Sequence, residues 1–314
     1  MPQPATRDVH PIDQILTNLS IAFRNERFLW EKICPPMRVD RKSGTFFKYD
    51  KDFWLRRSPG GKRGDDGRYT RIGYGVSTDT YETVERGFEK LLDDPTQAAS
   101  QTPESLQLLD LQYLTSQIQY ELEKDISAEV FVTGKWGTSN TLTGGNQWSD
   151  FANSDPIKDA DTAKRVILRN TGTRPNFMFI GLTGWEKLKE HPLVLDKYKY
   201  TQVGIMTEQL VAAVLGIPEL VVGDSVENTA VEGQAFVGAD IWVDNALFVV
   251  KNQPGLGVAN GAFTMMWPEA GAIPWAVQAY RSEEQRGNVQ RVFTHYTPKI
   301  VANDFGYLYL DTIA

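Results

Sequence analysis

Apolar residues recur at helical spacing between residues 103 and 132. Intervals of three and four place them on one face of a helix, and they are Leu111, Leu114, Ile118, Leu122, Ile126 and Val130. Four acids occupy the other faces: Glu121, Glu123, Asp125 and Glu129. Thr102 suits the N-cap and Pro103 the first helical position. We therefore predict a spine helix over 103–132, about 40 Å long at 1.5 Å per residue, with the six apolar residues as its core face.

Two segments typical of strands flank a Gly-rich charged stretch. Residues 45–55 (TFFKYDKDFWL) and 68–84 (RYTRIGYGVSTDTYETV) are aromatic and β-branched, which predicts a long hairpin. Limbs of about 11–13 residues would each reach roughly 40 Å. An isolated two-stranded ribbon is only marginally stable in water, so we expect a partner chain. The charged residues expected to contact that partner are Arg56, Arg57, Lys62, Arg63, Asp65, Asp66, Arg68 and Arg71.

The remaining segments predict an α+β protein. Residues 1–44 read as a proline-punctuated arm with one amphipathic piece at 12–23, and 134–155 as a polar linker anchored by Trp136 and Trp148. From residue 156 helical and strand patterns alternate, which indicates an α/β subdomain. Helices are predicted at 156–170, 183–191 (stopped by Pro192) and 207–216, and strands at 176–182, 219–226, 245–252, 273–282, 288–297 and 306–311.

Bulk composition excludes several classes of protein. With 314 residues and a formal charge of −7, the chain does not have the basic balance of a dedicated nucleic-acid binder. Its single cysteine, Cys34, cannot form an internal disulfide and fits a reducing compartment. The first residues lack a signal-peptide pattern. No apolar run approaches the ~18–20 residues of a membrane span, so no membrane contact is expected.

No candidate motif for catalysis or cofactor binding has the residue spacing that its chemistry requires. Lys62 follows Gly61 but lacks the rest of a phosphate-binding loop, and 255–261 misses the dinucleotide pattern. The three histidines, His10, His191 and His295, form no metal-binding spacing. The acidic run 155–161 lacks the glycine and final glutamate of a calcium loop and is better suited to capping a helix. We expect no enzyme activity, cofactor or metal.

The order of these parts resembles the major capsid protein of tailed bacteriophages, which has the Hong Kong-type capsid fold. Three stretches carry the resemblance: 147–201 (beginning QWSDFANSDPIKDAD), 210–252 (beginning LVAAVLGIPELVVGD) and 277–313 (beginning VQAYRSEEQRGNVQR). It covers nearly the whole chain but contains no single diagnostic motif.

The resemblance implies four parts. Residues 1–44 would be an N-terminal arm and 45–82 an extended loop lying over an adjacent subunit. Residues 83–149 and 266–296 would form a peripheral domain with the spine helix, and 150–265 and 297–314 an axial domain at the centre of each capsomer.

The resemblance also implies a structural function. The chain would self-assemble into hexamers and pentamers of an icosahedral shell that encloses double-stranded DNA without sequence-specific binding. Portal, scaffolding and cement proteins would be its other partners. The protein would be located in the virion, which would be assembled in the host cytoplasm. Two alternatives stay open at this point: an encapsulin-like nanocompartment shell, and an α/β enzyme with an unrecognised carboxylate site.

Overall fold

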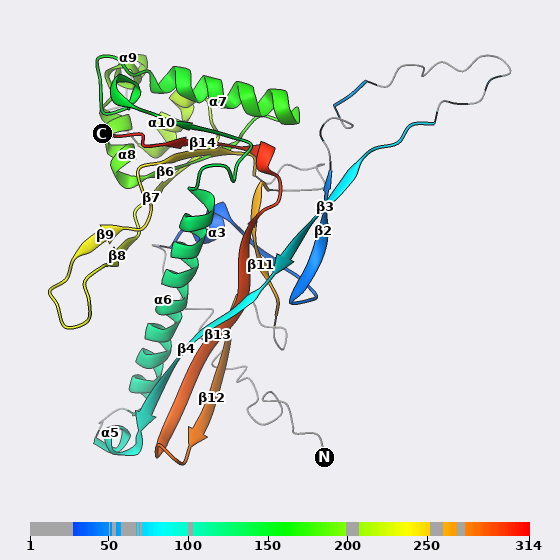
Figure 1. Ribbon diagram of the computed structural model, residues 1–314. Coiled ribbons are helices and arrows are strands. Elements are labelled where there is room, and N and C mark those ends of the chain that lie inside the picture. The colour runs from blue at the N-terminus through cyan, green and yellow to red at the C-terminus, as the bar shows by residue number, and fades with distance from the viewer. Residues whose placement is uncertain are drawn as a thin grey trace.

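A computed structural model describes most of the chain. The described residues are 28–49, 51, 55–57, 67, 69, 71–99, 103–198, 207–251, 260–268 and 274–314. The sheet built on β13 (Gly287–Ile300) runs beside one long helix, and the other large sheet lies with several shorter helices near the C-terminus (Figure 1). This mixed arrangement confirms the predicted combination of helices and sheets.

The long helix is α6, Pro103–Val130. It lies against β4 (Val84–Asp93) and β13 (Gly287–Ile300), and each of the six apolar stripe residues is at most 2% exposed. The helix ends two residues before the expected boundary, where the indole Nε1 of Trp136 donates a 2.8 Å hydrogen bond to the Val130 carbonyl. That bond satisfies one of the carbonyls that a helix end leaves without a partner. Thr102, the expected N-cap, lies outside the described residues.

The first sheet is built on β13, whose length lets it pair with three strands. One edge pairs with β4 over ten residues, from Gly287↔Asp93 to Tyr296↔Val84. The other edge pairs first with β12 (Ala276–Ser282) and then with β11 (Ala262–Met266). The strand β1 (Pro36–Arg38) adds to β11 in parallel. Helix α3 (Trp30–Ile33) precedes it and buries Trp30 and Ile33, so this part of the expected arm is integrated into the core.

The second sheet has the order β5 (Thr138–Thr141), β14 (Gly306–Leu310), β10 (Ala246–Val249), β6 (Phe177–Gly181) and β7 (Glu219–Gly223). Helices α7 (Pro156–Thr171), α8 (Leu182–Glu190), α9 (Pro192–Tyr198) and α10 (Glu208–Leu215) accompany it. The alternation of helices and strands predicted after residue 156 is present. Asp155 caps α7 by accepting a 3.0 Å bond from the Lys158 amide, and Gly216 ends α10 with φ 68°, a conformation that glycine adopts without strain.

The two faces of the second sheet belong to two different hydrophobic clusters. In β6, Phe177 and Phe179 join the cluster that contains the α6 stripe, whereas Met178 and Ile180 join the cluster formed with α7 and α10. Alternate residues of a strand point to opposite faces, and a sheet covered on both faces reads as a continuous apolar run. The sheet is therefore the shared wall between the two cores.

The structure corrects several boundaries. The strands β2 (Ser43–Tyr49) and β3 (Val76–Glu82) form the predicted antiparallel hairpin, but with seven residues each in place of 11–13. Residues 71–75 are irregular, because Gly73 and Gly75 disfavour strand conformation. Pro192 stops α8 as predicted and then begins α9, a position that proline favours. The amphipathic segment 12–23 lies outside the described residues.

The sheets also cross the expected domain boundaries. The predicted linker 134–155 contributes β5 to the second sheet, and β11, expected in the axial part up to residue 265, belongs to the first. The sequence analysis did not anticipate β4 beyond its first residue. Further elements that it missed are α5 (Asp94–Ala99), η1 (Gly144–Asn146), β8 (Val226–Asn228), β9 (Gly238–Asp240) and η3 (Asn303–Phe305).

Truncation of the buried stripe tests the role of α6. Leu122 is 0% exposed, so Leu122→Ala should lower the free energy of unfolding of the unassembled protomer by about 2–5 kcal/mol. Leu109 on the same helix is 59% exposed, and Leu109→Ala should change it by at most about 0.5 kcal/mol. Urea unfolding followed by circular dichroism measures both, and equal effects would contradict the assignment of the core face.

Candidate intersubunit surfaces

The hairpin β2–β3 is fixed at its stem to the body of the protein. Asp79 on β3 lies 2.7 Å from Lys48 of β2 and 3.4 Å from Lys299 of β13. The hydrogen bond from Lys48 is the main cause that lowers the pKa of Asp79 to about 2, so this carboxylate is ionised at neutral pH. At the base of the hairpin, next to the Ser43↔Glu82 pair, the hydroxyl of Thr83 donates a 3.0 Å bond to the Lys42 carbonyl.

Beyond its stem the hairpin exposes large apolar side chains together with arginines. Tyr69, Ile72 and Tyr74 are 73%, 73% and 63% exposed. On the paired strands, Phe47 is 65% exposed. Arg56, Arg57 and Arg71 are exposed, whereas Lys62, Arg63, Asp65, Asp66 and Arg68 lie outside the described residues. Several large exposed apolar side chains on one projecting segment indicate an interaction site.

Glu123 is the central polar contact of the fold. It lies on α6, is 0% exposed, and receives hydrogen bonds from three distant segments. The amides of Leu29 and Trp30 donate to it at 2.8–3.1 Å, and the Ser225 hydroxyl and Trp242 indole donate at 2.6 Å each. This carboxylate therefore joins the arm, the spine helix and the segment that leads into β8.

Every one of these partners donates a hydrogen bond to Glu123. Burial raises the pKa of its carboxyl group, and the bonds from Ser225, Leu29, Trp242 and Trp30 oppose that rise. Because amide and indole N–H groups can only donate, the acceptor-only ionised carboxylate is the form that satisfies all of them. Sequence analysis placed Glu123 among the acids on the polar faces of α6 and gave no sign of its burial.

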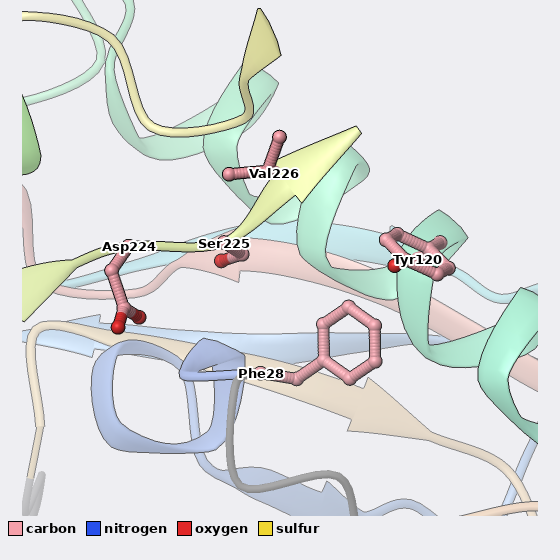
Figure 2. A pocket seen from close by; sticks show the side chains of 5 residues that line it. All are labelled: Phe28, Tyr120, Asp224, Ser225 and Val226. Atoms are coloured by element: carbon pink, nitrogen blue, oxygen red, sulfur yellow. The ribbon is translucent and has the colours of Figure 1, made fainter. Parts of the chain in front are cut away.

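A pocket of about 260 Å³ opens beside this contact. Figure 2 shows Phe28 of the arm and Tyr120 of α6 on one side, with Asp224, Ser225 and Val226 above and beside them. The Phe28 and Tyr120 rings meet edge to face with centroids 4.7 Å apart. Among the described residues that line it, Asp224 is the only one with a carboxylate, and the Ser225 hydroxyl is part of the Glu123 contact.

A second hairpin, β8–β9, projects from the other side of the molecule (Figure 1). Val231, Phe236 and Val237 on it are 78%, 73% and 53% exposed. A 2.8 Å ion pair between Lys124 of α6 and Glu227 of β8 holds its base. Sequence analysis missed this surface. The signal that could have indicated it is charge, because the hairpin lies within residues 200–250, which contain no Lys, Arg or His.

Comparison with known proteins decides the family. The family model described as phage major capsid protein E matches residues 113–286, which include most of α6 and most members of both hydrophobic clusters. The chain belongs to the phage major capsid protein E family.

Curated relatives of this capsid protein carry the same description. The major capsid protein of Burkholderia phage BcepMu is 27% identical over 223 residues, which are 68% of this chain and 69% of that protein. The major capsid protein of Pseudomonas phage JBD67 is 26% identical over 253 residues, covering 77% and 78% of the two chains. The chain is thus a structural protein of a phage shell and a component of the virion.

Solved structures share the fold of the capsid protein. A phage-related protein from Bordetella bronchiseptica RB50 matches with a TM-score of 0.75, at 20% identity over 96% of this chain and 98% of that chain. The capsid of cyanophage P-SCSP1u matches with a TM-score of 0.58, at 12% identity over 88% and 85%. An encapsulin from Synechococcus elongatus also matches, with a TM-score of 0.53 at 11% identity over 100% and 97%. The fold alone therefore does not separate phage shells from nanocompartments, whereas the family does.

A buried serine and histidine of the capsid protein, Ser154 and His191, lie side by side, and their hydrogen bonds are structural. The Leu193 amide donates to Nδ1 of His191 at 3.3 Å, so the ring proton is on Nε2 and faces the Ser154 hydroxyl at 3.0 Å. The Ser154 hydroxyl donates in turn to the Asp150 carbonyl at 2.6 Å. A general base would have to accept the serine proton, so this orientation does not activate Ser154.

The second pocket, of about 290 Å³, lies at the start of α7. Its two carboxylates have structural partners, since Asp155 caps α7 and Asp159 accepts a 3.0 Å bond from the Trp148 indole. Within the described ranges, no three His, Cys, Asp or Glu residues are grouped so as to hold a metal. None of the helices described is long and apolar enough to cross a bilayer.

The Glu123 contact can be tested with a thiol that the chain already carries. Cys34 is the sole cysteine, is 1% exposed and follows the two amides that Glu123 binds. Glu123→Leu leaves buried donors without an acceptor and should lower the free energy of unfolding by about 3 kcal/mol. It should also raise the rate of Cys34 modification by an aromatic disulfide reagent about tenfold or more, as local opening becomes easier.

The matched control is Glu121→Leu. Glu121 lies on the same helix with its side chain 43% exposed, 3.6 Å from Arg86, and its loss should change stability by about 1 kcal/mol or less. Unchanged Cys34 reactivity in Glu123→Leu would show that the arm does not depend on this carboxylate.

His191 predicts a pH dependence of stability. Burial lowers the pKa of its imidazole below the ordinary value of 6.5, and Asp155 partly opposes this. As the pH falls below about 6.5, the unfolded chain binds a proton that the folded chain does not, so the free energy of unfolding must fall. His191→Gln should show a shallower fall between pH 7 and pH 5 in urea unfolding. Identical slopes in both proteins would refute this role for His191.

Proposed function

We propose that the hairpin β2–β3 and the loop at its end are a strap that lies over the next subunit of the shell. The observation that carries this proposal is the exposure of Tyr69, Ile72 and Tyr74 beside Arg56, Arg57 and Arg71. None of these residues belongs to either hydrophobic cluster of its own chain, and the strands β2 and β3 lie on the side of the molecule away from β8–β9 (Figure 1). A surface of this kind becomes favourable when a second copy of the chain covers it.

The other parts take roles around this strap. Residues 1–44 act as an arm whose end is fixed by Glu123. The first sheet with α6 forms the peripheral part of the subunit, and the second sheet with α7–α10 forms the axial part at the capsomer centre. Hexamers and pentamers of this subunit close into an icosahedral shell.

The shell encloses double-stranded DNA without reading its sequence. A formal charge of −7 supports this, because tight binding of phosphates requires a basic surface and would oppose packing and release. We infer that portal, scaffolding and cement proteins meet the shell, and that it assembles in the host cytoplasm. The subunit itself performs no catalysis, which agrees with the structural partners of Ser154, His191, Asp155 and Asp159.

The nanocompartment alternative shares the strap and the shell but differs in cargo. No described feature favours it, and the family to which the chain belongs is a phage family. A particle purified with a cargo enzyme in place of DNA would support it.

Deletion of the loop tests the strap. Removing residues 57–70 and closing the hairpin with a short turn should leave a folded, soluble protomer, because the described residues of this stretch, Arg57, Gly67 and Tyr69, belong to neither hydrophobic cluster. It should abolish closed shells or misdirect them, as judged by negative-stain microscopy and sedimentation. Circular dichroism and thermal unfolding check the protomer.

The matched control replaces 57–70 with a Gly/Ser segment of the same length. This variant keeps the length of the loop but removes its charged and aromatic side chains. We expect this variant to fail in the same way as the deletion. Full-sized shells of unchanged heat resistance from either variant would overturn the strap. Small, non-assembling particles of the unaltered protein at every salt concentration would overturn the shell function itself.

A further inference from the structure

Charge is segregated along this chain in a way that matches its two hairpins. Residues 56–71 carry six Arg or Lys and two Asp. Residues 200–250 carry seven Asp or Glu and no Lys, Arg or His. One protruding hairpin therefore ends in a basic segment, and the other lies within an uninterrupted acidic one.

The acidic hairpin presents its charges to solvent. Three of its acids, Asp224, Glu232 and Asp240, are exposed, and within the described residues none of them has a cationic partner. Only Glu227 is neutralised, by Lys124 of α6. The apolar side chains of Val231, Phe236 and Val237 lie between these acids in the chain. This combination of exposed acids and apolar groups complements the arginines and aromatic residues of the strap.

The base of the acidic hairpin is held firmly enough to act as a receiving surface. The strands pair from Val226↔Asp240 to Asn228↔Gly238. The side-chain carbonyl of Asn228 accepts bonds from the amides of Ala230 and Val237 at 3.1 and 3.0 Å. The Ile241 amide donates to the Ser225 carbonyl at 3.0 Å, directly beside the Glu123 contact.

The two hairpins leave the body on opposite sides, β8–β9 beside α6 and β2–β3 beyond the first sheet (Figure 1). Complementary surfaces on opposite sides of one chain meet only between copies, in a head-to-tail contact that repeats around a ring. If β8–β9 instead met its own counterpart, Asp224, Glu232 and Asp240 would face like charges, which is unfavourable.

We propose that β8–β9, with Asp224, Glu232 and Asp240, is the surface that receives the strap of the next copy. This inference rests on the proposed strap function and names its acceptor. Apolar contact between the aromatic residues of the strap and Val231, Phe236 and Val237 supplies the burial, and the charges set the register.

Charge reversal on each side tests the pairing. In the first variant Asp224, Glu232 and Asp240 are each changed to Lys, and in the second Arg56, Arg57 and Arg71 are each changed to Glu. Each variant alone should remain a folded protomer and give about tenfold fewer shells or less, because like charges then face each other across the contact. The chain that combines both sets restores opposite charges and should recover assembly.

An equimolar mixture of the two single-sided variants gives a sharper result. The basic strap of the first variant then matches only the acidic hairpin of the second, and the acidic strap of the second matches only the basic hairpin of the first. Rings must therefore alternate and must contain an even number of subunits. Hexamer-based sheets or tubes should form, and pentamers and closed shells should not. A reversal of the same size at Glu186, Glu190 and Glu284, which are exposed elsewhere, should leave assembly near that of the unaltered protein.

Disulfide trapping supplies a second measurement that does not depend on reversed charges. Ile72→Cys combined with Phe236→Cys should give a ladder of covalently linked chains when assembled shells are treated with diamide. Either substitution alone should not, since Cys34 is buried. Absence of the ladder together with failure of the combined charge variant to recover would overturn the proposed acceptor. Normal shells from the Asp224, Glu232, Asp240 variant would overturn it too and leave the shell function intact, whereas failure of the unaltered protein to assemble would overturn both.

Discussion

One buried carboxylate connects parts of this subunit that lie about a hundred residues apart in sequence. Glu123 accepts bonds from residues 94 and 93 positions before it and from residues 102 and 119 positions after it. A buried charge is tolerated only when its hydrogen-bonding capacity is satisfied, so the arm, the spine helix and the base of β8–β9 must be positioned together. The receiving hairpin and the arm therefore depend on the same contact.

The second sheet imposes the other constraint on the subunit. Because alternate residues of β6, β7, β10 and β14 belong to different clusters, neither core is complete without the sheet. A change in the angle between the two parts of the subunit has to pass through these strands, whose interiors are close-packed and resist small displacements. The two hydrophobic cores of the subunit thus share one sheet, and a domain boundary defined by residue number does not separate them.

The sequence predicted the features that depend on local spacing. The α6 stripe, the Asp155 cap, the Gly216 end and the β2–β3 hairpin all follow from side chains within a few residues of one another. It could not predict Glu123, whose donors come from segments about a hundred residues away. Nor could it predict β5, four polar residues, Thr138–Thr141, that form a strand only because β14 offers an edge. Strand formation depends on such tertiary neighbours more than on intrinsic preference, and the surface of β8–β9 became visible only when its exposure was known.

The long strand β13 has a mechanical consequence for a container. Its hydrogen bonds to β4 and β12 lie perpendicular to the strand direction. A pull along the strand therefore loads the ten residue pairs with β4 and the seven with β12 together, whereas a pull across it opens them one after another. Since α6 lies alongside β13, tension directed along the spine is shared by the whole ladder, and the subunit resists stretching far better in this direction than peeling from its edge.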